Sequence, residues 1–282
     1  MPIVALLHPV AQLDWTRWSI HPSTVIGLAA LGALYFWRAA QRGAGDAPVT
    51  LPRRIAFVGG LLAIFTSLNG PLHDLSDHYL FSAHMVQHLV LTLVMPPLLL
   101  AGLRGWMLRP LLDLPIVGSL ARRVTRPIVC FATFNVVVAA WHLPPLYNAA
   151  VASHAVHIVQ HLMFMTAAVL MWWPYLSPLP ELPRLAYPGQ MLYSFVMVIP
   201  MSIVSIYIAM ADELLYPAYA SAPRIWNIDP MMDQMVGGLI MWIPGGLFFY
   251  GVMTVVFFKW VGSGAGDDTA SAQVNWKPAR TN

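Results

Sequence analysis

Seven long runs of apolar residues, separated by shorter polar stretches, recur along the chain. A helix rises about 1.5 Å per residue, so roughly 20 predominantly apolar residues cross the hydrocarbon core of a bilayer. The predicted spans cover residues 23–38, 54–68, 79–103, 128–142, 156–173, 190–210 and 235–260. The pattern therefore predicts an all-α fold, a polytopic membrane protein built as a bundle of seven transmembrane helices.

The composition agrees with this prediction and excludes several other classes of protein. Of the 282 residues, 58% are apolar and only 10% are charged, whereas an average water-soluble domain has about 25% charged residues. So little charge cannot cover a water-facing surface. The single cysteine, Cys130, can form neither an internal disulfide nor a metal site of paired thiolates. We therefore expect neither a soluble or disordered chain nor a disulfide-stabilised secreted fold.

The basic residues predict the orientation of the bundle. All but two of the 15 Lys and Arg residues follow the first, third or fifth span or lie in the C-terminal tail; the two exceptions are Arg17 and Arg224. Basic loops are typical of the cytoplasmic side of a membrane. We therefore expect the N-terminus outside and the C-terminus in the cytoplasm. The formal net charge of +3 then reflects topology and does not indicate binding to nucleic acid.

The same pattern divides the chain into three parts. Residues 1–22 are expected to form an external N-terminal segment, uncleaved because it lacks the basic start and the apolar length of a signal peptide. Residues 23–260 form the seven-helix transmembrane domain. Residues 261–282, rich in Gly, Ala, Asp and Ser, are expected to be a flexible cytoplasmic tail.

Histidine is unusually abundant, and its positions are biased. All ten histidines fall outside the membrane or in the outer half of a predicted span: His8, His21, His73, His78, His84, His88, His142, His154, His157 and His161. The pattern His-x-Val-Gln-His-Leu occurs twice, beginning at His84 in the third span and at His157 in the fifth. Both spans enter the bilayer from the same side, so the two motifs lie at similar depth and could face each other.

Each repeated motif groups polar side chains on one helical face. Positions i, i+3 and i+4 of a helix lie together, so the motifs present His84, Gln87 and His88, then His157, Gln160 and His161. His154 extends the second group by almost one turn. Paired imidazoles at this spacing are typical transition-metal ligands. The alternative is that they join helices by hydrogen bonds within the membrane. The two glutamines stand where a zinc protease has its glutamate, and an amide cannot act as a general base.

Other polar residues near the outer side are candidates for supporting roles. His142 and the group His73, Asp74, Asp77 and His78 could form an outer shell or an access route for a metal, or could simply be solvated loop residues. Met85 and other outer methionines could add soft ligands suited to Cu(I), although methionine also fills cores. Asp233 could orient an imidazole, or could be a first-turn acid of its own helix.

An ordered series of short motifs carries a family resemblance. It consists of His84–Leu89, Met95–Leu99, Trp141–Pro144 with Tyr147, His157 and His161 with Trp172–Pro174, and Asp233 and Gln234 with Gly238, Met241 and Trp242. Over residues 61–260 this series resembles the CtaG family of multispanning assembly factors for caa-type cytochrome c oxidase. Residues before about position 60 match no motif. The family differs from a single-span copper chaperone of the same name, and the lack of a cysteine pair fits that distinction.

The resemblance implies a role in maturing a haem-copper oxidase, for which copper delivery has been proposed. It implies that the histidines are ligands, that the protein is a multi-pass protein of the bacterial plasma (inner) membrane, and that an oxidase subunit and the lipid bilayer are its partners. A copper chaperone is a further candidate partner.

Four functions remain to be weighed. The leading hypothesis is an assembly factor that binds copper transiently through His84, His88, His157 and His161. The alternatives are a haem-binding membrane protein with bis-histidine ligation and a metal transporter. A transporter would need a polar route through the inner half, where the sequence offers few polar groups. We do not expect an enzyme, because no span places a nucleophile near a plausible base.

Overall fold

The structure of the chain is a computed structural model that describes residues 16 and 18–263. Most of the predicted external segment 1–22 and of the predicted tail 261–282 lies outside the described residues. Within the described part every regular element is helical. The long helices are α1 (Pro22–Ala40), α2 (Leu51–Asn69), α10 (His154–Leu176), α11 (Tyr187–Ala209) and α12 (Pro230–Gly262). The shorter ones are α3 (Pro71–His78), α4 (Phe81–Leu89), η2 (Val90–Val94), α5 (Met95–Gly102), α6 (Gly105–Leu112), α7 (Pro115–Val124), α8 (Pro127–His142), α9 (Pro144–Ala152) and η3 (Pro217–Tyr219).

The helices confirm the predicted fold class. In the described residues, six helices are long and apolar enough to cross a membrane, counting α4, η2 and α5 as one rod. The pair α7 and α8, bent by 78°, supplies the seventh candidate. The predicted boundaries differ by a few residues. The largest difference is at α12, which begins five residues before the predicted start because Asp229 caps it, accepting a hydrogen bond of 2.9 Å from the Met231 N–H.

A widened turn in the third span has a cause in the sequence. Pro96 and Pro97 have no backbone N–H, so the helix cannot continue its regular i to i−4 bonds through them. Immediately before them, residues Val90–Val94 form a π-helix, and the Met95 N–H reaches the carbonyl of Val90, five residues back. This widened turn lies one turn beyond His88 and lets the span continue as α5.

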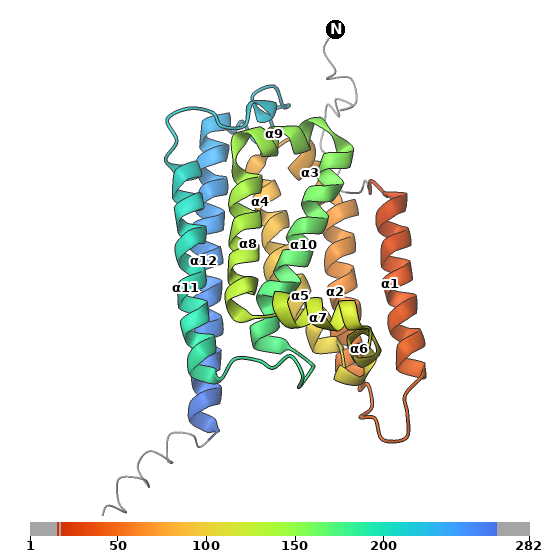
Figure 1. The fold of residues 1–282 in the computed structure, drawn as a ribbon. Coiled ribbons are helices and arrows are strands. Elements are labelled where there is room, and N and C mark those ends of the chain that lie inside the picture. Colours follow the sequence, from red (N-terminus) through yellow and green to blue (C-terminus); the bar gives the residue numbers. More distant parts are fainter. Residues whose placement is uncertain (1–15, 17, 264–282) are drawn as a thin grey trace, which may run out of the picture.

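The helices pack side by side with α4, α8 and α10 at the centre of the bundle (Figure 1). On one side α11 and α12 form a close antiparallel pair. A side chain at Gly238 of α12 would come within 2.8 Å of Ala209 in α11, so glycine is needed there for the two backbones to approach. On the other side α2 packs on α5, and α1 packs on α2 at the edge.

The two ends of the bundle differ in composition. The short helices α3 and α9 close one end, while α6 and α7 lie at the other (Figure 1). Connections rich in arginine meet at this second end: Arg53 donates to the carbonyls of Ala101 and Leu103, and Arg104 donates to that of Pro48. The described histidines lie toward the first end. The basic connections thus share one end as predicted, and which membrane face that end occupies stays a prediction.

Candidate metal centre

The two repeated motifs face each other across the interface of α4 and α10. The ring centres of His84 and His157 are 6.0 Å apart, and those of His84 and His161 are 6.1 Å apart. His88, one turn farther along α4, lies 5.7 Å from His161. The predicted juxtaposition of the motifs is therefore confirmed, because each helix turns its histidine face toward the other.

An aspartate completes the most compact group of ligand atoms. Asp77, His84 and His157 each offer one ligand atom, and these three atoms all lie within 4.8 Å of one another. The distance from His157 Nδ1 to the Asp77 carboxylate is 3.6 Å. We call Asp77, His84 and His157 the outer triad. It joins three elements, α3, α4 and α10, so only the folded bundle assembles it.

The charge of Asp77 is maintained by the imidazoles around it. Burial by itself would raise the pKa of Asp77, but the neighbouring imidazoles, above all those of His73 and His157, hold it well below its ordinary value. Burial lowers the pKa of His73, which lies 3.5 Å from the same carboxylate. At neutral pH the Asp77 carboxylate is therefore ionised, the form in which it binds metal.

Several buried ring nitrogens have no hydrogen-bond partner. Among the residues that the structure describes, no partner contacts either nitrogen of His84 or His88, Nδ1 of His161 or Nε2 of His142. The exposed fractions of these side chains are only 2% for His84 and 5% for His88. Buried polar atoms are almost always hydrogen-bonded, and each exception costs about 1 to 3 kcal/mol. A concentration of such atoms is what a ligand-binding site without its ligand would show.

The two motif glutamines have different environments. Gln87 donates to the Ser67 carbonyl at 2.6 Å and lies 3.2 Å from His73 Nδ1, while its oxygen accepts from the Ser76 hydroxyl. It therefore fixes the ring of His73; a supporting role at a metal site stays a prediction. Gln160 is buried, and neither atom of its amide has a partner within the described part of the chain. The two motifs share a sequence, but their glutamines therefore differ in hydrogen bonding.

Asp233 lies in the first turn of α12, in agreement with one of the two alternatives that the sequence left open. Its carboxylate accepts hydrogen bonds from the Phe81 N–H at 2.6 Å, from the Ser82 N–H at 3.1 Å and from the Ser82 hydroxyl. These are the free donors at the start of α4, so Asp233 caps the neighbouring helix, and no imidazole in the described part of the chain bonds to it. It positions the site indirectly, because α4 carries His84 and His88.

The remaining predicted site residues are distributed unequally. His142 of α8 is buried with its ring centre 5.8 Å from that of His88, so it joins the cluster. His154 is exposed, its ring lies 5.7 Å from that of His21, and it contributes no atom to the outer triad. His78 is half-buried and contributes no atom to the outer triad. Met85 is fully buried and packs in the apolar core.

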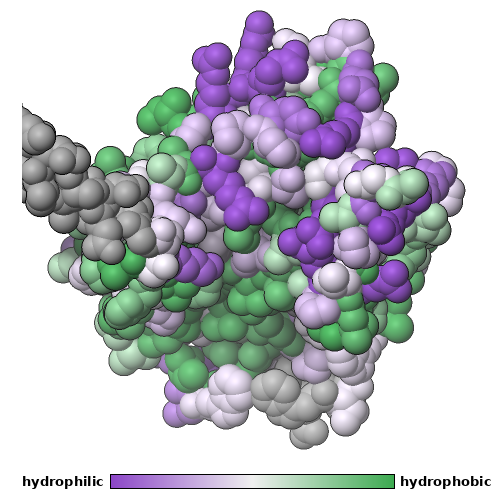
Figure 2. Space-filling view, turned by 90° about the horizontal axis from the view of Figure 1, so that it is seen from below, coloured by the Kyte–Doolittle hydropathy of each residue, from purple (hydrophilic) through white to green (hydrophobic). Residues whose placement is uncertain are grey.

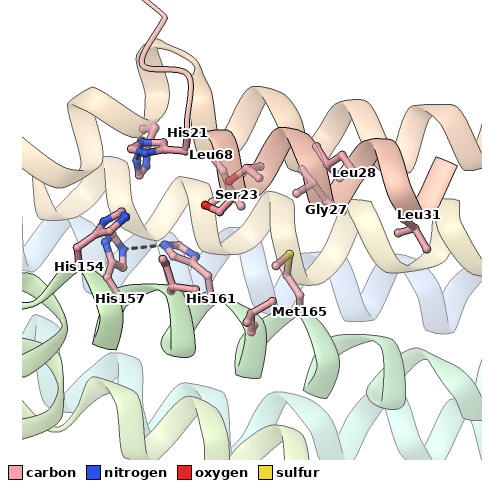
Figure 3. Close-up of a pocket in the computed structure, with 15 residues that line it drawn as sticks. His21, Ser23, Gly27, Leu28, Leu31, Leu68, His154, His157, His161 and Met165 are labelled. Carbon is pink, nitrogen blue, oxygen red and sulfur yellow. Dashed lines mark hydrogen bonds between the residues drawn. The ribbon is translucent and has the colours of Figure 1, made fainter. Parts of the chain in front are cut away.

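A groove opens beside the cluster. It has a volume of about 370 Å³ and lies between α1, α2 and α10. Figure 3 shows His21, His154, His157 and His161 at one end of it, with Gly27, Leu31 and Met165 along its apolar length. His157 and His161 are held 2.7 Å apart between their Nε2 atoms. Because His157 belongs both to the outer triad and to the groove wall, the groove gives lateral access to the site.

Two members of this region were not among the predicted ligands. The sequence assigned Asp77 to an outer shell or access route, and its spacing of seven residues before His84 carries no recognised ligand pattern. His21 precedes the first span, 52 residues from His73, yet their Nε2 atoms are 3.0 Å apart. No local signal could have found this pair, because α1 and α3 meet only in the fold.

Comparisons with known proteins agree with the motifs. The family described as cytochrome c oxidase caa3 assembly factor (Caa3_CtaG) matches residues 30–263, a longer stretch than the predicted 61–260. Two uncharacterized proteins, one of Mycobacterium bovis and one of Mycobacterium tuberculosis, are each 28% identical to this chain over 232 residues, which is 76% of its length. The chain spans only about a third of their length, 34%. No solved structure matches. The family match covers most of the chain, and this protein therefore belongs to the cytochrome c oxidase caa3 assembly factor family.

Proposed function

We propose that the protein binds copper as cargo at the outer triad and passes it to a subunit of a haem-copper oxidase during assembly. The single observation that carries this proposal is His84, a buried imidazole with no partner on either nitrogen within the described residues, facing Asp77 and His157. Such a ring is costly unless a ligand binds it. The family supplies the link to oxidase assembly.

The ligand types suit a transferable copper ion. Imidazole is among the protein ligands that suit copper. The outer triad offers two imidazoles and one carboxylate, which leaves at least one coordination position open. An incoming ligand from a partner could take that position and draw the ion away in steps. Three ligands therefore support transient binding better than a closed set of four.

The alternatives receive less support from the geometry. A haem held by one histidine from each helix would need a porphyrin between the two rings, but a carboxylate oxygen of Asp77 lies within 4.8 Å of a nitrogen of each. A transporter would need polar side chains through the arginine-rich half as well. There Tyr175 and Ser194, both buried, bond to each other at 2.8 Å and offer no ligand to a passing ion.

The proposal places the site near the external face of the bacterial plasma membrane, which follows from the expected orientation of the basic loops. The partner would be an oxidase subunit in the same bilayer. A copper chaperone outside the membrane is the expected donor. Metal exchange would then occur at the end of the bundle closed by α3 and α9.

The proposal is tested by metal titration of the full chain in detergent. The protein is titrated with Cu(I) under anaerobic conditions in competition with a chromophoric Cu(I) chelator. We expect the double variant Asp77→Asn, His84→Gln to bind copper at least about 100-fold more weakly than the unaltered chain, because ligand loss exceeds the roughly 10- to 100-fold effect of altering groups behind the ligands.

His154→Ala is the matched control, because His154 lies in α10 one turn before His157 but outside the outer triad. It should change the affinity by no more than about twofold. Copper binding no stronger than that of an unrelated membrane protein would contradict the proposal, as would an unchanged affinity in the double variant. A Soret band in the purified protein would favour the haem alternative instead.

The link to assembly needs a second readout in cells. Cells that produce the double variant in place of the unaltered chain should assemble an oxidase depleted in copper, whereas cells with His154→Ala should not. A fully loaded oxidase in cells with the double variant would separate this protein from copper delivery, even if the purified chain binds copper.

A further inference from the structure

A cavity of about 510 Å³ lies at the arginine-rich end, where several helices terminate. Its wall is formed by the start of α2, the end of α5, the start of α6, the end of α10 and the connection after α10. The ends of spans are where a membrane protein leaves the hydrocarbon core and meets the lipid headgroups. We call this cavity the arginine pocket, because four arginines line it: Arg53, Arg104, Arg109 and Arg184.

The arginine pocket has an excess of positive charge. Of the four arginines, only Arg109 forms an ion pair with a carboxylate of the described residues, at 2.9 Å. The charges of Arg104 and Arg184 both act on that of Arg53. Among the described residues of the lining, Asp46 is the one acid, and its carboxylate accepts a hydrogen bond of 3.0 Å from a backbone N–H of its own loop. Three guanidinium charges therefore lack a paired counter-charge in the described part of the chain.

The bonds that these arginines make to the protein use only part of each guanidinium group. Arg104 and Arg184 each donate through Nε to a backbone carbonyl, at 3.2 and 2.9 Å. Arg53 donates to two carbonyls through Nη1 alone. A guanidinium group has five N–H donors, so most of them are left for a further acceptor. A carbonyl is also neutral, and it leaves the charge of the arginine uncompensated.

The lining of the arginine pocket selects for the kind of anion. Guanidinium groups bind phosphate through paired N–H bonds and a complementary charge. The rest of the wall includes apolar side chains, among them Leu100, Leu103, Leu176 and Pro178. A free phosphate would leave these side chains without an apolar partner, whereas a phospholipid supplies both a phosphate and hydrocarbon. The pocket therefore suits an anionic amphiphile better than a small anion.

The adjacent helix α7 indicates that the pocket lies at headgroup level. It is bent by 78° from α8, which runs along the bundle, so α7 lies across the bundle (Figure 1). Ile116 and Leu120, four residues apart, are 83% and 57% exposed. Arg122 and Arg123 are exposed in its last turn. Amphipathic helices of this kind lie in the plane of the membrane interface. Because α7 packs on α6, which lines the pocket, the pocket is at a similar depth.

We propose that the arginine pocket binds the phosphate of an anionic phospholipid through Arg53, Arg104 and Arg184. Basic pockets between spans are known to recognise such headgroups. The bound lipid would join the connection between α1 and α2, the start of α6 and the connection between α10 and α11. It would thereby stabilise the arginine-rich end by supplying the counter-charge that the described residues lack. This site does not depend on copper and lies at the opposite end of the bundle from the outer triad.

The test measures lipid binding to the full chain. The protein is purified in a neutral detergent and titrated with phosphatidylglycerol, and the bound lipid is counted by native mass spectrometry. We expect the double variant Arg104→Gln, Arg184→Gln to bind this lipid about 30-fold more weakly, since each arginine near an anionic headgroup contributes about fivefold. Phosphatidylcholine, which has no net charge, should bind to the unaltered chain at least about tenfold more weakly than phosphatidylglycerol. An excess of inorganic phosphate should not displace phosphatidylglycerol.

The matched control is the double variant Arg122→Gln, Arg123→Gln. It removes the same charge from the same end of the bundle, but neither residue lines the pocket. Its affinity for phosphatidylglycerol should change by less than about twofold. Arg184→Gln alone guards against a folding defect, because this side chain is exposed; it should weaken binding by about fivefold. The lipid should raise the unfolding temperature of the unaltered chain and of the control more than that of the pocket variant.

The other outcomes would overturn the proposal. Equal weakening in the two double variants would mean that the lipid is attracted by the general charge of this end and has no specific pocket. Equal affinity for phosphatidylcholine would reduce the site to an apolar contact. Displacement of the lipid by inorganic phosphate would make it a site for the free ion. Copper binding by the pocket variant should equal that of the unaltered chain, so the failure of either proposal leaves the other intact.

Discussion

The two ends of the bundle carry polar side chains of opposite character. At the arginine-rich end, guanidinium groups meet acceptors: Arg53 donates to two carbonyls at 2.7 and 2.8 Å, and Arg184 donates to the Ser177 carbonyl at 2.9 Å. At the histidine-rich end, His84 and His88 have no partner on any ring nitrogen within the described residues. The guanidinium groups thus find hydrogen-bond acceptors in the protein itself, whereas the imidazoles of His84 and His88 do not.

A cavity at the arginine-rich end has a greater volume than the groove beside the outer triad. The space between α5, α6 and the connection before α11 has a volume of about 510 Å³ and is lined by Arg53, Arg104, Arg109 and Arg184. Figure 2 shows hydrophilic side chains on this end of the molecule, interrupting the apolar surface. Each of these four arginines has an acceptor in the protein. The two ends therefore differ in their ionisable side chains: the cations at one end have acceptors, and buried imidazoles at the other do not.

The largest expected change in stability concerns Asp233, which supports the histidine-rich end without being a candidate ligand. Asp233→Asn should lower the free energy of unfolding by about 3 kcal/mol, because a buried carboxylate that accepts two N–H bonds and one hydroxyl bond becomes a poorer acceptor. Unfolding in detergent measures this. Asp212→Asn, an exposed acid near the same end, should change stability by less than about 0.5 kcal/mol. Equal effects in both variants would show that Asp233 does not hold α4.

A smaller change, an increase in the free energy of unfolding, tests whether the buried imidazoles lack hydrogen-bond partners. In metal-free protein, His88→Leu should raise the free energy of unfolding by about 1 kcal/mol, since it removes two buried nitrogens that lack partners in the described structure. The same unfolding experiment applies, with a chelator present. Lower stability in this variant would mean that the ring has a structural partner, and the contrast between the two ends would fail.

Effects no larger than this are expected at the arginine-rich end. Arg53→Met should lower the free energy of unfolding by about 1 kcal/mol, because the carbonyls of Ala101 and Leu103 at the end of α5 lose their donor. Arg109→Ala is the control, since its ion pair with Glu181 is largely exposed and should matter by less than about 0.5 kcal/mol. Copper binding should be unchanged in both variants, and a weakened site in either would contradict the separation of the two ends.

Much of the fold could be read from the sequence because it depends on length and polarity. Apolar runs long enough to cross a bilayer predicted the spans. The five long helices, the rod of α4, η2 and α5, and the bent pair of α7 and α8 match them. The clustering of basic residues after alternate spans predicted their common end. The start of α12 was missed because its boundary depends on the Asp229 cap, a local bond that hydropathy does not report.

The candidate site was predicted only in part. The repeat at His84 and His157 indicated two histidine faces, and its period of one turn placed them on facing helices. It left Asp77 and His142 as an outer shell or access route and could not place them beside the motifs, because α3 and α8 approach these faces only through tertiary packing. Nor could it show that His154, in register with the motif, turns toward His21 instead.

The sequence by itself determined the membrane environment, the number of spans and the gathering of histidines toward one end, because these follow from the composition and periodicity of single segments. The tertiary structure decided which histidines meet, that Asp77 adds a negative charge among them, and that Asp233 caps a neighbouring helix. Ligand geometry depends on atoms brought within a few ångströms by different helices, and no single segment encodes such a distance.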